Sequence, residues 1–166
     1  MHTTNKTIKF SITFSFLPKK NEIANLVSKE SRCNMSDEKK SQRVKLELEY
    51  PIRSSLSILF QQISTPSGLQ AWFADDVSVN GSIYSFAWND GTSNKCELIR
   101  NVRNKYMRFK VIGDPKDEFW EMKIIPDELS GGQILIVTEF TTEEEADELA
   151  DIWDAAVDAL CNRIGA

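Results

Sequence analysis

The chain has 166 residues, of which 41% are hydrophobic and 27% charged, and it carries a formal net charge of -5. This size and composition are typical of one soluble globular domain, and the acidic balance argues against a nucleic-acid surface, which needs clustered Lys and Arg. His2 is the only histidine, and Cys33, Cys96 and Cys161 have no metal-binding spacing. These counts exclude histidine-based triads and most zinc enzymes, so we predict no metal and no cofactor. An odd number of cysteines would leave one unpaired in any disulfide scheme, and we therefore expect a cytoplasmic protein, in which thiols stay reduced.

The first 34 residues differ in composition from the rest of the chain, being rich in Lys, Asn, Ser and Thr. Apolar residues alternate with polar ones between positions 8 and 16, which permits a strand, whereas a secretion signal is disfavoured because no small-residue cleavage site follows. We interpret residues 1–34 as a disordered extension, or as upstream sequence from a start codon assigned too early. Met35 then opens a polar leader over residues 35–42, and the folded domain spans 43–166.

Residues 43–50 alternate apolar and charged side chains, which predicts a half-buried strand. Pro51 follows directly and predicts the first turn of a short amphipathic helix, because its fixed φ suits that position. Thr65, as the N-cap, and Pro66 predict the start of a second short helix that carries Trp72. Two helices are therefore expected to follow the first strand.

The middle of the chain consists of alternating segments separated by turn residues. Asn80-Gly81 predicts a hairpin, and the Asn-Asp-Gly sequence at 89–91 predicts another. Further turn sequences at 113–115 and 130–132 separate the later segments. We therefore predict six consecutive antiparallel strands.

The last element is a long amphipathic helix. Thr142 followed by Glu145 has the spacing of a capping box, and an apolar stripe through Trp153 and Val157 lies opposite an acidic face. A helix of about 22 residues is roughly 33 Å long, which is enough to cross a sheet.

This order of elements, together with the segment TPSGLQAWFADDV at residues 65–77, resembles the START-like superfamily, also called Bet v 1-like or SRPBCC. The sequence is most similar to the small START-like proteins of Bacteroidetes, which are related to the Aha1 domain. The resemblance covers Arg43 to about Gly165. It implies an α+β helix-grip fold, in which a curved antiparallel sheet of about seven strands wraps around the long C-terminal helix.

In that fold the concave face of the sheet and the inner stripe of the long helix enclose an interior cavity. Strand alternation directs large apolar side chains towards it. The candidate lining residues are Trp72, Phe73, Tyr84, Phe86, Trp88, Met107, Phe109, Trp120, Met122, Trp153 and Val157. Tyr84, Arg100 and Thr138 are candidate polar groups for orienting a ligand, although Arg100 is also explained as a solvated strand residue. The apolar side chains could equally fill an ordinary core, since aromatic residues dominate cores.

The resemblance implies noncatalytic binding of a hydrophobic small molecule or lipid by a cytoplasmic protein without a membrane span. An alternative is an Aha1-like protein-interaction module that uses the acidic face of the last helix. Catalysis is the least favoured hypothesis. Adjacent Asp75 and Asp76 would point to opposite faces of a strand, and the glutamates at 143–145 are explained by the start of a helix. We assign no catalytic residue.

Overall fold

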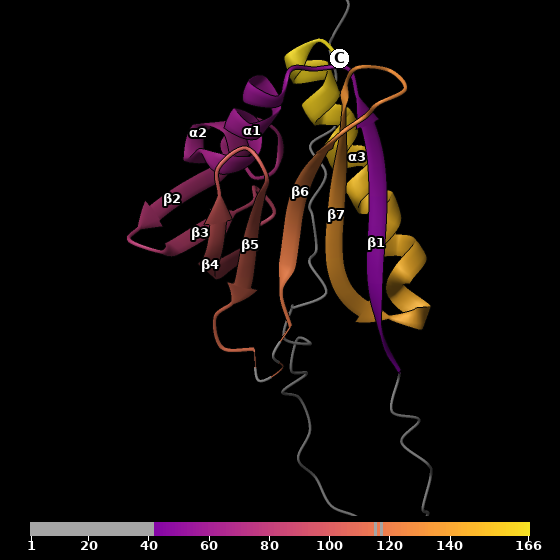
Figure 1. Cartoon of the computed structure of the whole chain (residues 1–166). Helices are drawn as coiled ribbons and strands as arrows, with labels where there is room; N and C mark the ends of the chain where they lie inside the picture. Colours follow the sequence, from indigo (N-terminus) through magenta and orange to yellow (C-terminus); the bar gives the residue numbers. More distant parts are fainter. Residues whose placement is uncertain (1–41, 115, 117) are drawn as a thin grey trace, which may run out of the picture.

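The computed structural model describes residues 42–114, 116 and 118–166 (Figure 1). The predictions for residues 1–34 and for nearly all of the leader lie outside these residues. The described elements are, in chain order, β1 (Arg43–Ile52), α1 (Leu56–Ser64), α2 (Pro66–Trp72), β2 (Asp76–Asn80), β3 (Ile83–Ala87), β4 (Ser93–Val102), β5 (Tyr106–Val111), β6 (Trp120–Pro126), β7 (Gln133–Thr142), a 3₁₀ turn (Glu143–Glu145) and α3 (Ala146–Ile164).

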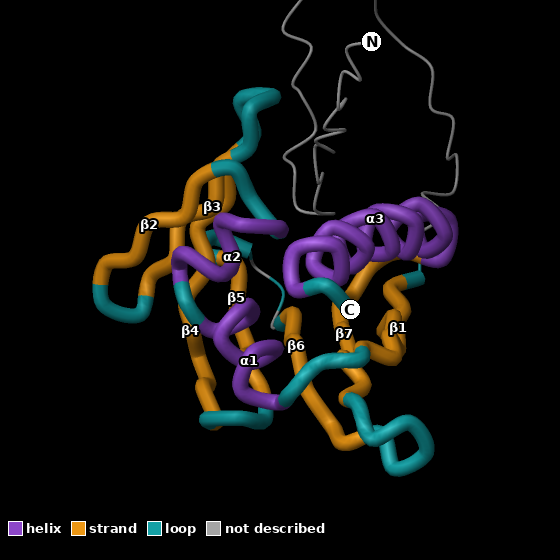
Figure 2. Tube along the Cα trace, turned by 90° about the horizontal axis from the view of Figure 1, so that it is seen from above, coloured by secondary structure: helices purple, strands orange, loops and turns teal. Residues whose placement is uncertain are grey.

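The strands form one antiparallel sheet in the order β1-β7-β6-β5-β4-β3-β2, so the first strand of the chain pairs with the last. Viewed from above, α3 lies over β7 and β1, whereas α1 and α2 lie over the other half of the sheet (Figure 2). All three helices cover the same face, and the apolar core lies between them and the sheet. The predicted α+β helix-grip fold is confirmed.

The prediction that Pro51 starts a helix is wrong. Pro51 continues β1 and pairs with Ile134, and α1 begins only after Ser55, whose hydroxyl accepts a hydrogen bond from the Ile58 backbone N–H. β1 is an edge strand, where proline is tolerated because one side of the strand makes no ladder hydrogen bonds. Pairing with β7 therefore extends the strand through Ile52.

The junction between α1 and α2 has Thr65 as the N-cap of α2, as predicted. Thr65 Oγ1 accepts from the Gly68 N–H at 3.0 Å and donates to the Gln61 carbonyl at 2.9 Å, which joins the start of α2 to the end of α1. Gly68 is buried, and a Cβ at this position would lie 2.5 Å from the Gln61 carbonyl oxygen. Only glycine allows the two helices to approach this closely.

The turn at the β2–β3 hairpin is confirmed with one change in its register. Asn80 pairs with Ile83, so the two loop residues are Gly81 and Ser82. Gly81 takes a positive φ of 62°, whereas Asn80 remains in the strand.

The start of α3 differs from a capping box. The Thr142 hydroxyl donates to the Glu145 carboxylate at 3.0 Å, and the Thr142 side chain caps no backbone N–H. The helix begins instead with the 3₁₀ turn Glu143–Glu145, whose acidic side chains lie at the positive end of the helix dipole.

Candidate functional site

All eleven residues predicted to line the interior are buried, with no side chain more than 8% exposed. They belong to one apolar cluster formed by the inner face of the sheet, α2 and α3. Burial alone does not distinguish a ligand-lining side chain from a core side chain, so their contact with a ligand remains a prediction.

Phe73, the C-cap residue of α2, lies at the centre of the aromatic side chains. Its ring centroid lies 5.3 Å from that of Phe86, 5.5 Å from that of Trp120 and 5.6 Å from that of Trp153. The Phe73 and Trp120 rings are stacked, as are those of Phe73 and Trp153. One side chain therefore connects the sheet to both α2 and α3.

A second layer of rings lies on the sheet itself. Phe109 and Trp120 stack at 4.3 Å, and Tyr84 meets Phe109 edge-on at 5.2 Å. These residues come from β3, β5 and β6, so alternation places them on one face. We call Phe73, Phe86, Trp88, Phe109 and Trp120 the aromatic cluster.

Buried indole N–H groups near this cluster have acceptors within the protein. Trp72 Nε1 donates to the Gln62 carbonyl at 3.2 Å, and Trp88 Nε1 donates to the Phe73 carbonyl at 3.0 Å. Trp153 Nε1 donates to a side chain instead, Glu139 Oε2, at 2.8 Å. That last bond identifies a residue which the sequence analysis missed.

Glu139 lies on β7 with its side chain in the apolar interior, and it is only 2% exposed. While Oε2 accepts from Trp153, the other oxygen, Oε1, has no hydrogen-bond partner in the described part of the chain. Thr141 lies two residues farther along the same face of β7, fully buried, and its hydroxyl also has no partner among the described residues. We call Glu139 and Thr141 the polar pair.

Of the polar groups predicted from sequence, two lie elsewhere. Thr138 is buried on the opposite face of β7, because successive strand residues alternate between faces. Arg100 is exposed on β4. Tyr84 is buried, and desolvation raises the pKa of its hydroxyl. Once Leu135 and Val137 are known to face inward, strand alternation places Glu139 inward as well.

Burial dominates the electrostatics of Glu139. Desolvation raises the pKa of its carboxyl to about 7, although the hydrogen bond from Trp153 and the positive charge of Arg43 oppose the rise. The same interior raises the pKa of the Cys96 thiol to about 12, mainly through burial and partly through the charge of Glu139. The interior therefore disfavours charge, and Glu139 takes up a proton far more readily than an exposed glutamate.

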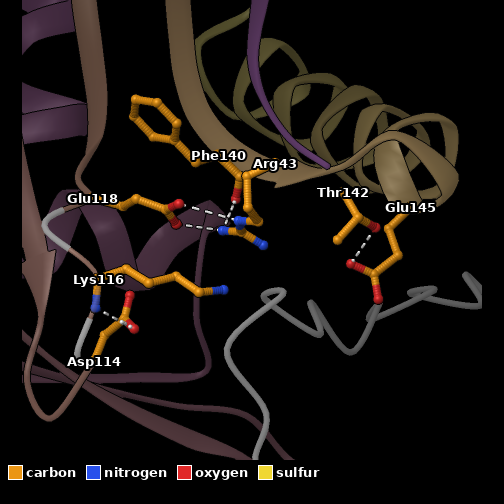
Figure 3. Close-up of polar contacts among 7 residues, drawn as sticks. All are labelled: Arg43, Asp114, Lys116, Glu118, Phe140, Thr142 and Glu145. Atoms are coloured by element: carbon orange, nitrogen blue, oxygen red, sulfur yellow. Dashed lines mark hydrogen bonds and ion pairs between the residues drawn. The ribbon is translucent and has the colours of Figure 1, made fainter. Parts of the chain in front are cut away.

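At one end of the sheet, Arg43 of β1 contacts β7 and the segment that precedes β6. Its guanidinium donates to both carboxylate oxygens of Glu118, with Nε 3.1 Å from Oε1, and to the Phe140 carbonyl at 2.8 Å (Figure 3). Thr142, the last residue of β7, and Glu145, which directly precedes α3, lie near the same end (Figure 3). The hydrogen bond to Phe140 places this ion pair at the end of β7 that carries Glu139 and Thr141.

The family model of the START-like superfamily domain matches residues 40–166. The chain belongs to the START-like superfamily. The predicted resemblance is thereby confirmed, and the START-like domain accounts for every element that the structure describes.

Two solved structures illustrate this START-like relationship. BfR322 from Bacteroides fragilis, a solution NMR structure, is 31% identical over 73% of this chain and 90% of its own, with a TM-score of 0.54. The Aha1 dimer from Colwellia psychrerythraea is 19% identical over 73% of this chain and 96% of its own, with a TM-score of 0.61. At that identity the Aha1 similarity shows a shared fold. No curated protein has a significant sequence match to this START-like chain.

Two further observations concern the described part of the START-like chain. No group of three or more His, Cys, Asp or Glu side chains is placed to hold a metal ion within it. None of its helices is both long and apolar enough to cross a bilayer.

Proposed function

We propose that this START-like chain binds an apolar small molecule or lipid, without converting it, between the inner face of the sheet and α3. The observation that carries the proposal is the polar pair: two buried polar atoms on one strand face have no hydrogen-bond partner among the described residues, in an otherwise apolar interior. Leaving such a group unpaired costs about 1–3 kcal/mol. Sites for small molecules combine an apolar lining with a few polar groups of this kind.

The position of the aromatic cluster supports a ligand location outside the cluster, beside it. Its rings contact one another at 4.3–6.4 Å between centroids, so they occupy their own half of the interior. The polar pair lies beside Leu46 and Val44 of β1, which pair with Glu139 and Thr141 respectively, and Glu139 contacts α3 through Trp153. We therefore assign the ligand to the space between β7, β1 and α3, with Trp120 and Trp153 as its aromatic neighbours.

Binding of N-phenyl-1-naphthylamine, a neutral dye that fluoresces in apolar surroundings, tests the proposal on the full chain. Ala156 on α3 is buried in the apolar core, whereas Ala159 on the same helix is exposed. Ala156→Leu should fill part of the space and weaken dye binding about tenfold, and Ala159→Leu should leave it within about twofold. Circular dichroism verifies that both variants fold. A wild-type chain that does not bind the dye, or equal affinities in the two variants, would contradict the proposal.

A protein-interaction role is the second candidate, and the solvent face of α3 favours it. Five exposed acidic side chains lie there: Asp147, Glu148, Asp151, Asp154 and Asp158. The shared fold with an Aha1 protein adds support for this role at the level of the fold only. A chain that fails to bind the dye but binds a basic protein in a salt-dependent manner would favour this second candidate.

A further inference from the structure

The polar pair also restricts the chemistry of the ligand, provided that the proposed function holds. Glu139 Oε1 and Thr141 Oγ1 belong to side chains on the same face of β7, whose Cα atoms are two residues and therefore about 7 Å apart along the strand. Buried polar atoms in native proteins nearly always have a hydrogen-bond partner. Two atoms on one face that lack a partner within residues 42–114, 116 and 118–166 therefore favour a bound ligand as the missing partner.

The surroundings of Glu139 decide which kind of partner fits. Trp153 donates to Oε2, so Oε1 is the carboxylate oxygen that has no partner among the described residues. Two apolar side chains lie beside Glu139. Leu46 of β1 pairs with it, and Trp120 of β6 precedes Glu121, the residue that pairs with Thr138. A partner must therefore be largely apolar and must bring a single polar group to Oε1.

A hydroxyl group meets this requirement in either protonation state of the carboxyl. It accepts from Oε1 when Glu139 carries the proton, and it donates to Oε1 when Glu139 is ionised. The Thr141 hydroxyl can likewise donate or accept. A hydrocarbon satisfies neither atom, and a carboxylate would place a second negative charge next to Glu139 in a buried site.

We infer that the ligand is an apolar molecule that carries a neutral hydroxyl group, and that Glu139 and Thr141 bind this hydroxyl between β7 and α3. Trp153 acts as a positioning residue, because its indole N–H holds the carboxyl of Glu139 from the helix side.

Three probes of matched shape test the inference on the full chain: 2-naphthol, naphthalene and 2-naphthoate, each measured by displacement of N-phenyl-1-naphthylamine. We expect 2-naphthol to bind about tenfold more tightly than naphthalene, since one buried hydrogen bond contributes about 1 kcal/mol or more. We expect 2-naphthoate to bind more weakly than 2-naphthol.

Variants of the polar pair should abolish this preference selectively. Thr141→Val keeps the shape of the side chain, and Glu139→Met keeps its length, although it also leaves the Trp153 indole without its acceptor. Each should reduce the ratio of naphthol to naphthalene affinity at least about threefold. Thr138→Val, on the opposite face of β7, is the matched control and should leave the ratio unchanged.

The outcomes separate the inference from the proposed function. Equal affinities for naphthol and naphthalene, which an internal water on the polar pair would produce, overturn the inference while dye binding still supports the proposed function. Tightest binding of naphthoate, or an unchanged ratio in both polar-pair variants, overturns it as well. If neither the dye nor any of the three probes binds, the proposed function itself fails.

Discussion

The aromatic cluster and the polar pair differ in whether their buried polar groups have hydrogen-bond partners. In the aromatic cluster, rings stack on rings, and the indole of Trp88 finds a backbone acceptor. On β7, beneath α3, Glu139 and Thr141 each have a buried polar atom without a hydrogen-bond partner in the described part of the chain. The aromatic cluster therefore stabilises the fold. The polar pair lowers the stability of the ligand-free protein, and a bound ligand would restore it. This difference leads us to locate the candidate function beside β7 and not among the aromatic residues that dominate the sequence.

Removing a ring from the aromatic cluster should have the largest effect. Trp120 is 2% exposed and stacks on both Phe73 and Phe109. Trp120→Ala should lower the free energy of unfolding by about 3–5 kcal/mol, because a large cavity replaces the indole. Urea denaturation measures the change. Ile99→Ala, at a position 46% exposed on β4, should change it by less than about 0.5 kcal/mol. Similar losses in the two variants would contradict the assignment of stability to the cluster.

The polar half should make the stability of the ligand-free protein depend on pH. Glu139 has a pKa of about 7 in the folded protein, against 4.5 for an ordinary glutamate. Between these values the folded chain binds more protons than the unfolded chain, so the free energy of unfolding falls as pH rises, by about 3 kcal/mol in total at 1.36 kcal/mol per pKa unit. The charge of Arg43 opposes this rise, and Cys96, with a pKa of about 12, does not titrate in this window.

Urea denaturation at pH 5, 6, 7 and 8 measures this dependence. Glu139→Gln keeps an acceptor for Trp153 but cannot ionise, so its stability should fall less than that of the wild type over this range. Glu143→Gln, which alters an exposed carboxylate at the start of α3, should behave like the wild type. Parallel pH profiles for the wild type and Glu139→Gln would show that Glu139 does not have a raised pKa.

The smallest effect should come from Thr141, and its sign is opposite to that of most core substitutions. Thr141→Val replaces an unpaired buried hydroxyl with a methyl group of similar size, so we expect the ligand-free protein to gain about 1 kcal/mol of stability. Thermal unfolding of the wild type and the variant measures the gain. A loss of stability would mean that the hydroxyl already has a partner within the protein.

Local patterns in the sequence predicted most of the fold. Thr65 and Pro66 specify the start of α2 through contacts within a few residues, and Gly81 sets the β2–β3 turn in the same way. Pro51 was misinterpreted because its strand is completed by Ile134, far away in the chain. Local propensity could not reveal that pairing.

The polar pair escaped prediction for a related reason. β7 is an inner strand with apolar residues on both faces, Leu135 and Val137 on one and Ile134 and Ile136 on the other. Alternation alone therefore does not decide which face is inside, and Thr138, not Glu139, is the β7 residue that the sequence suggests as a polar contact. Only the packing of α3, with Trp153 bonded to Glu139, determines the inner face.

The most direct test of the account is an NMR titration of the full ¹⁵N-labelled chain with 2-naphthol, which observes the indole N–H resonances. The chain has four tryptophans, and a Trp153→Phe variant assigns the resonance of Trp153. We expect the Trp153 indole to shift most among them and to shift together with the backbone amides of Glu139 and Thr141. A Trp153 resonance that stays in place while amides on the outer face of the sheet shift would contradict the account.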